Sequence, residues 1–134
     1  MSVRTVKAKS LTRLGLVVGL AATAAVVAAP TASAESYNGC AWPRVCFYLT
    51  DANWNSAAPT AAFQDVTTSY QNLGSRSRGA DWVVNSRNDD RAYLRYIRNS
   101  TGATEYLCLP PNYHVHFSSE FTVTGVRIDT AADC

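Results

Sequence analysis

The chain has 134 residues, with twelve Lys and Arg against ten Asp and Glu and a formal net charge of +2. Four of the basic residues lie before residue 35, so the rest of the chain holds eight basic and ten acidic residues, a net charge of −2. This balance excludes the strong positive field typical of proteins that bind nucleic acid or anionic membranes through net charge.

Residues 1–34 have the pattern of a secretory signal peptide. A basic start precedes an apolar run over 14–28, and Ala32-Ser33-Ala34 supplies the small residues of a cleavage site. The run of about 15 residues is shorter than the roughly 20 that a membrane-spanning helix needs. We therefore expect a secreted, extracellular protein with a single domain over 35–134; a retained membrane anchor is the alternative.

The sequence after the leader predicts an all-β domain. Helical periodicity is nearly absent, and short runs rich in β-branched and aromatic residues alternate with clusters of Gly, Pro, Asn, Asp and Ser, including turns over 51–56 and 86–90. Such spacing is typical of a small antiparallel sandwich, and the likeness of two halves offset by roughly 45 residues favours two four-strand units packed face to face. The predicted strands are 45–49, 61–66, 70–73, 81–85, 92–97, 105–109, 114–117 and 123–129.

Four cysteines follow the leader, and an even number in an exported chain indicates two disulfides, for which three pairings are possible. Cys40 and Cys46 are near enough to close a small loop, which leaves Cys108 to hold the C-terminal Cys134. In the chain-entropy model the two bonds contribute roughly 2–3 and 3–4 kcal/mol. Free thiols or a metal site are the alternatives, but no C-x-x-C pair is present.

Motifs of catalysis are missing from the sequence. There is no G-x-S-x-G, no H-E-x-x-H, no phosphate-binding glycine loop and no dinucleotide fingerprint. His114 and His116 alternate on a predicted strand and so share a face, but a third metal ligand is not evident, and we interpret them as strand surface. Asp89 and Asp90 stand in a turn, where carboxylates mostly serve turn geometry. We therefore expect no enzyme, no cofactor and no bound metal.

Aromatic residues are plentiful, with three Trp, seven Tyr and four Phe, all after the leader. Packing in the core and between strands is the default use of such residues. An exposed set such as Trp42, Trp54 or Trp82 could instead stack on a glycan.

Residues 105–112, EYLCLPPN, are the strongest candidate for a binding segment. Two prolines follow Leu109, where they fix φ and remove backbone donors, and a disulfide at Cys108 would pin the other side. A rigid, extended, apolar segment is what a protease inhibitor presents, because preorganisation lowers the ordering cost of binding. The alternative is that Leu107 and Leu109 are core residues of a strand that the prolines end.

The chain after the leader resembles the secreted bacterial metalloproteinase inhibitors with a βγ-crystallin-like fold. The likeness covers nearly all of 37–129. It is carried by short motifs: C-x-x-x-x-x-C-F-Y over 40–48, DANW over 51–54, YQNLG over 70–74, ADWVVN over 80–85 and YLRY over 93–96.

The resemblance implies a disulfide-stapled βγ-crystallin-like sandwich of two four-strand Greek-key motifs. It also implies inhibition of thermolysin-like zinc endopeptidases by a rigid substrate-like loop. The matching reactive positions are Cys108 and Leu109, with Tyr106 and Leu107 before them and Pro110 after. This chain departs from the family at position 113, a tyrosine where the typical member has a second cysteine, and in the aromatic–glycine corners of both motifs. Neither motif offers the oxygen ligands that calcium needs.

We therefore expect a monomeric, secreted peptidase inhibitor whose partner is a secreted protease. We expect no nucleic-acid partner and, after cleavage of the leader, no membrane partner. The first alternative is a secreted βγ-crystallin-like binding module for cell-wall glycan or another surface, with no inhibitory activity. The second alternative is a small toxin or antimicrobial protein, which only the small size and the predicted export support.

Overall fold

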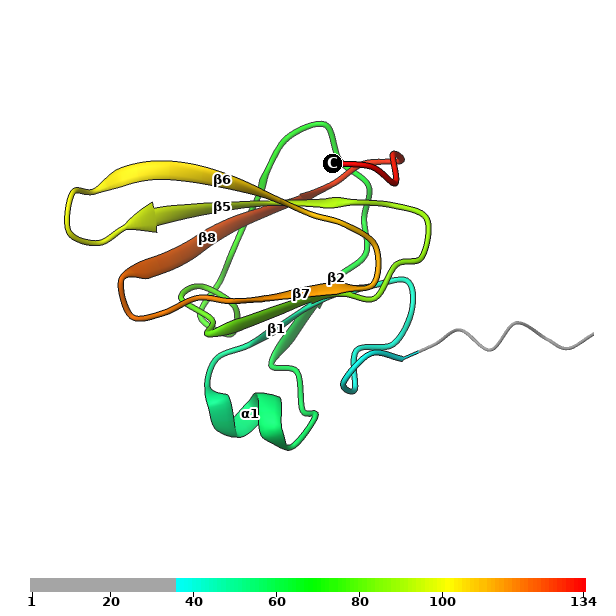
Figure 1. Ribbon diagram of the computed structural model, residues 1–134, viewed down its shortest axis with the longest axis horizontal. Helices are drawn as coiled ribbons and strands as arrows, with labels where there is room; N and C mark the ends of the chain where they lie inside the picture. The colour runs from blue at the N-terminus through cyan, green and yellow to red at the C-terminus, as the bar shows by residue number, and fades with distance from the viewer. Residues whose placement is uncertain (1–35) are drawn as a thin grey trace, which may run out of the picture. The chain divides into compact units, whose positions relative to one another are not determined.

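The computed structural model describes residues 36–134, and the predicted signal peptide lies outside the described residues. This part consists of two antiparallel four-stranded sheets (Figure 1). The first sheet has the strand order β2-β1-β4-β7, and the second has the order β3-β8-β5-β6. The elements are β1 Val45–Tyr48, α1 Asp51–Asn55, β2 Ala61–Phe63, β3 Gln71–Asn72, β4 Trp82–Asn85, β5 Ala92–Arg98, β6 Ala103–Leu109, β7 Tyr113–His116 and β8 Phe121–Ile128.

Each sheet takes three strands from one half of the chain and one from the other. The first sheet combines β1, β2 and β4 with β7, and the second combines β5, β6 and β8 with β3. In each half the fourth strand returns to lie beside the first, since β4 pairs with β1 and β8 pairs with β5. Neither sheet can therefore form completely without the other half.

All eight predicted strands are confirmed, and the prediction of a plain turn over 51–56 is wrong. That segment holds the single-turn helix α1, whose N-terminus is capped by Thr50: the Asn53 N–H donates to Thr50 Oγ1 at 3.2 Å. A side-chain acceptor at this position satisfies a backbone donor that would otherwise lack a partner. A helix of five residues is too short for its periodicity to be visible in the sequence.

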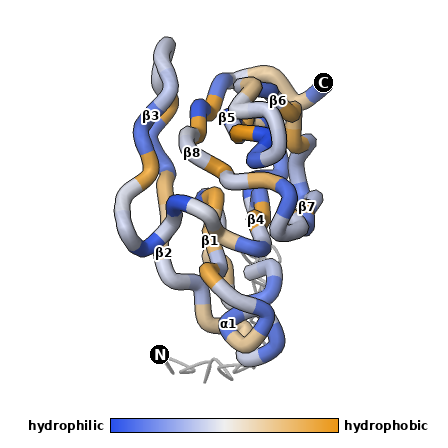
Figure 2. Tube along the Cα trace, turned by 90° about the vertical axis from the view of Figure 1, so that its left-hand side faces the viewer, coloured by the Kyte–Doolittle hydropathy of each residue, from blue (hydrophilic) through white to orange (hydrophobic). Residues whose placement is uncertain are grey.

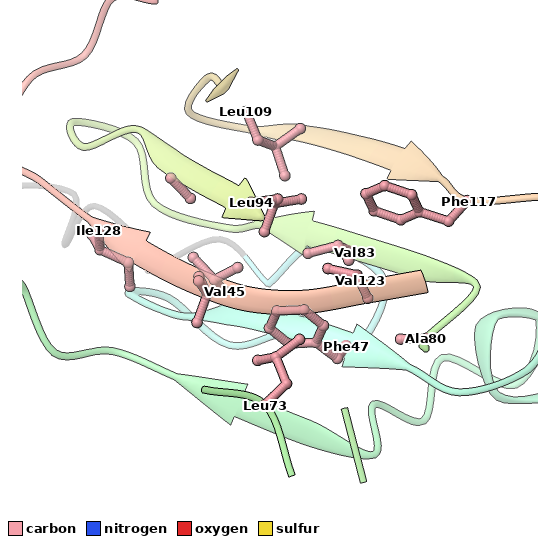
Figure 3. Close-up of a cluster of buried hydrophobic side chains, with 12 residues drawn as sticks. Val45, Phe47, Leu73, Ala80, Val83, Leu94, Leu109, Phe117, Val123 and Ile128 are labelled. Atoms are coloured by element: carbon pink, nitrogen blue, oxygen red, sulfur yellow. The ribbon is translucent and has the colours of Figure 1, made fainter. Parts of the chain in front are cut away.

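The main core lies between the two sheets (Figure 3). Strand side chains alternate between faces, so Val45 and Phe47 of β1 point toward the second sheet while Cys46 and Tyr48 point away from it. The tube in Figure 2 shows the resulting mixture of hydrophobic and hydrophilic positions along the strands. The buried members are Val45, Phe47, Leu73, Ala80, Val83, Ala92, Leu94, Leu109, Phe117, Val123, Val126 and Ile128.

A smaller core covers the outer face of the first sheet. Cys40, Cys46, Tyr48 and Val84 are buried there, and Trp54 of α1 packs against them. The Tyr48 hydroxyl donates to the Asn38 carbonyl at 2.6 Å. Burial, with a lesser contribution from the neighbouring Tyr37, raises the pKa of Tyr48 to about 12.

Both predicted disulfides are confirmed. Cys40 bonds Cys46, and Cys108 bonds Cys134. The bonds indicate an oxidising environment for the folded protein. No helix within residues 36–134 has the length and apolar character required to cross a bilayer.

Candidate functional site

The segment predicted as an inhibitory loop is strand β6. It pairs along its whole length with β5, and Leu109 lies opposite Ala92. Leu107 and Leu109 point inward, and Leu109 is only 3% exposed, with its side chain directed toward Leu94 (Figure 3). The prediction that Leu109 stands on an exposed substrate-like loop is therefore wrong. The period-two alternation of the strand places it in the core.

The other residues of this segment have different environments. Tyr106 is 60% exposed on the outer face of the second sheet. Cys108 shares that face, half-buried, and its disulfide ties β6 to the C-terminus. Pro110 is half-buried in the connection from β6 to β7. The disulfide and the prolines do constrain the segment, but they hold it within a sheet.

The prolines lead to a place where three connecting segments meet. The segments are 41–44, 86–90 and 110–113, and we call the surface that they form the Trp42 end. In Figure 1 it lies at the right, where the cyan, yellow-green and orange connections converge. Hydrogen bonds join the segments to one another: the Arg87 carbonyl accepts from the Asn112 N–H, and Arg87 Nη1 donates to the Pro43 carbonyl.

A buried amide holds two of these segments together. Asn85, the last residue of β4, is 0% exposed. Its Nδ2 lies 2.9 Å from the Asp90 carbonyl oxygen, 3.1 Å from that of Leu109 and 3.2 Å from that of Pro110. Its Oδ1 accepts from the Arg87 N–H at 3.1 Å. One side chain thus fixes the start of the proline segment against 86–90.

The third segment is the disulfide-closed loop 40–46, and Ser86 and Arg87 pin it. The Ser86 N–H donates to the Arg44 carbonyl at 2.9 Å, and the Arg44 N–H donates to Ser86 Oγ at 3.2 Å. Arg87 Nη1 donates to the Pro43 carbonyl at 2.7 Å. Arg87 is itself 8% exposed and paired with the buried Asp90, so the guanidinium is held in place from both sides.

Two large aromatic side chains stand exposed on this rigid base. Trp42 is 40% exposed and Tyr113 is 61% exposed. The Trp42 indole N–H donates to Asn88 Oδ1 at 3.1 Å, a contact that restrains the orientation of the ring. The Trp42 end therefore offers apolar anchors on a backbone that has little freedom left to lose.

An open pocket of about 400 Å³ adjoins the same loop. It shares Arg44 with the Trp42 end, and Arg87 Nη1 reaches the Gln64 carbonyl at 3.3 Å. Its lining includes the aromatic Phe63, the basic Arg44 and the acidic Asp65. The pocket therefore places both a charge of each sign and an apolar ring beside the Trp42 end.

The remaining tryptophans pack against each other. Trp54 and Trp82 are stacked with centroids 4.3 Å apart, and Trp82 Nε1 donates to Asp51 Oδ1 at 2.7 Å. His114 and His116 share one face, as predicted, and both contact Trp82, with ring centroids at 5.8 and 4.4 Å. Among residues 36–134 no group of three or more His, Cys, Asp or Glu side chains could hold a metal ion.

From the sequence, Trp42 was named as a candidate for glycan stacking and Pro110 as part of the inhibitory segment, but the burial of the polar residues that fix the Trp42 end, Asn85, Ser86 and Arg87, was missed. Asn85 and Asp90 occur in a strand end and a turn, where amides and carboxylates are common and say little about burial. Only the i, i+3 pair of Arg87 and Asp90 is a possible signal, and at a turn it is a weak one. Comparison of the chain with protein-family models, curated proteins and solved structures found no match. The choice of the Trp42 end as the candidate binding site therefore depends on the geometry and exposure of its own residues.

Proposed function

We propose that this protein is a secreted peptidase inhibitor that binds its target through the Trp42 end. The observation that carries the proposal is the pair of exposed aromatic side chains, Trp42 and Tyr113, on three segments fixed by buried hydrogen bonds. Trp and Tyr are enriched among the residues that dominate protein–protein affinity. A preorganised surface loses little entropy when a partner binds.

The closed loop 40–46 suits an inhibitor for a second reason. If a peptidase cut a bond between Cys40 and Cys46, the disulfide and the contacts of Ser86 and Arg87 would keep both new ends in place. The ends would stay at a high effective concentration, which favours resealing over release. A loop of this kind can occupy a cleft without being consumed.

The target class follows from the resemblance of residues 37–129 to the metalloproteinase inhibitors. We take a thermolysin-like zinc endopeptidase as the target. The return of β4 to β1 and of β8 to β5 supports the finer proposal of two Greek-key motifs in a βγ-crystallin-like sandwich, because that return defines the motif. The exchange of β3 and β7 between the sheets explains how the two motifs share one core.

The test is a titration of thermolysin with the protein, expressed from the full chain and purified from the medium of a secreting host. We expect inhibition by the unmodified protein and an inhibition constant at least about 30-fold higher for Trp42→Ala, the loss typical of a dominant contact residue. Tyr106→Ala is the control, because it removes an aromatic ring that is even more exposed, 60% against 40% for Trp42, from the segment first predicted to inhibit.

Three outcomes are informative. Loss of inhibition in Trp42→Ala alone supports the proposed surface. Loss in Tyr106→Ala alone returns the inhibitory contact to β6. Failure of the unmodified protein to inhibit thermolysin at micromolar concentration contradicts the proposed target class.

A further inference from the structure

The outer face of the second sheet carries a row of planar side chains that the proposed inhibitory surface does not use. Tyr93 and Arg95 belong to β5, Tyr106 to β6 and Arg127 to β8, and Tyr70 directly precedes β3. We call these five residues the Tyr–Arg face. The registers place Tyr93 opposite Arg127 and Arg95 opposite Tyr106, so their side chains point to the same side.

Rings and guanidinium groups are interleaved across this face. The Arg127 guanidinium lies 4.5 Å from the Tyr93 centroid and 5.8 Å from that of Tyr70. The Arg95 guanidinium is 5.5 Å from the Tyr70 centroid, and the Tyr70 and Tyr106 rings are 5.5 Å apart. These distances lie in the range of cation–π and aromatic contacts, so the side chains support one another.

Gly125 allows this arrangement. It lies opposite Arg95, and a Cβ at that position would come within 2.9 Å of Arg95 Nη2. Without a side chain there, the Arg95 guanidinium lies flat against the sheet. It donates to Asn72 Oδ1 at 2.7 Å and, through Nε, to Thr124 Oγ1 at 3.1 Å.

Positive charge dominates the middle of the face. The four strands contain one carboxylate, Glu105, which lies on the inner side bonded to Arg98. Arg95 donates only to neutral acceptors. Asp129, just beyond β8, bonds Arg91 at 2.9 Å and is 3.8 Å from Arg127. Arg95 and Arg127 therefore retain donors for an incoming anion.

We propose that the Tyr–Arg face binds an acidic polysaccharide, a polymer of sugars that carry carboxylates. Tyrosine rings offer flat apolar surfaces with hydroxyl groups at their tips, which suit sugar rings. Guanidinium groups match carboxylates with two parallel hydrogen bonds. An open sheet surface with repeated planar groups fits an extended chain better than a small molecule, and binding would hold the exported protein at a polysaccharide surface.

The test is affinity electrophoresis of the protein, purified as above, in gels that contain polygalacturonate, dextran or poly-glutamate. Polygalacturonate should retard the protein, while dextran, which has no charge, and poly-glutamate, which has no sugar, should not. Arg127→Gln and Tyr106→Ala should each raise the dissociation constant for polygalacturonate at least tenfold. Arg44→Gln, which removes the same charge near the first sheet, should leave it unchanged.

Equal retardation by poly-glutamate would overturn the assignment to a sugar polymer, and no retardation by polygalacturonate would overturn the site. Thermal unfolding of each variant separates lost binding from lost folding. Polysaccharide binding and inhibition use different surfaces, so each proposal can be disproved without affecting the other. Trp42→Ala should lose inhibition and keep polysaccharide binding, whereas Tyr106→Ala should do the reverse.

Discussion

Replacing Leu109 by alanine separates the core role of this residue from a role at a reactive bond. Leu109 is 3% exposed and packs in the cluster between the sheets. The three carbons removed are worth about 0.8 kcal/mol each, and the cavity left behind brings the expected loss in unfolding free energy to about 3 kcal/mol. Equilibrium urea unfolding measures the loss, which should move the midpoint while the slope stays constant.

Tyr106→Ala, three residues earlier on the same strand, is the control. Because its side chain is 60% exposed, the change in unfolding free energy should stay below about 1 kcal/mol. The opposite result would be a Leu109→Ala variant that keeps its unfolding free energy and loses inhibition. That result would mean that Leu109 faces the target and not the core.

Three further changes test the buried polar groups and the titrating groups. Asn85→Ala should lower the unfolding free energy by about 1–3 kcal/mol, because it leaves buried carbonyl groups without their donor; urea unfolding checks this, and an unchanged midpoint would contradict it. Burial raises the pKa of Tyr48 from an ordinary 10 to about 12. The neutral hydroxyl therefore stabilises the fold fully below about pH 10, and about 3 kcal/mol of unfolding free energy is lost as the pH rises toward 12. Tyr48→Phe should therefore unfold less steeply in alkali, as followed by circular dichroism, and an equally steep transition would argue against this origin. The Arg98 guanidinium and the Tyr96 hydroxyl hold the pKa of Glu105 below its ordinary value. The ionised Glu105 therefore stabilises the folded protein above about pH 4.3, and this stabilisation is lost as the pH falls through the lowered pKa. The melting temperature of Glu105→Gln should fall less than that of the unmodified protein below about pH 4, and a parallel fall would show that Glu105 does not contribute.

The strands could be predicted because each is a local pattern. The predicted strands are short runs with β-branched or aromatic residues between turn formers. The bounds agree within one residue in β5, Ala92–Arg98 against 92–97, and differ more in β2, Ala61–Phe63 against 61–66. The helix α1 could not be predicted in the same way, since one turn capped by Thr50 has no period of its own. The disulfide pairing was accessible because sequence proximity favoured Cys40 with Cys46.

The sheet order and the candidate site depend on contacts between distant residues. Strand β3 pairs with β8 in the second sheet and β7 pairs with β4 in the first, and because these partners are distant in sequence no local pattern predicts the pairing. The role of Asn85 could not be predicted either, because its amide donates to carbonyl groups 24 and 25 residues away, those of Leu109 and Pro110. These residues look like ordinary turn formers until the fold brings them together.

Leu109 was wrongly predicted to be exposed because the prolines that follow it were interpreted as part of a loop. The prolines after it indicated stiffness correctly, but stiffness can belong to a strand end as well as to a loop. The alternation of Tyr106, Leu107, Cys108 and Leu109 favours a strand with both leucines on one face, which is what the pairing with β5 produces.

Chemical-shift mapping can locate the surface through which the protein contacts a peptidase. The ¹⁵N-labelled protein, purified from the secreting host, is titrated with unlabelled thermolysin, and its backbone amide signals are followed. We expect the signals that shift or broaden most to belong to 41–44, 86–90 and 110–113. Changes centred on β6, with the Trp42 indole signal unaffected, would contradict this expectation.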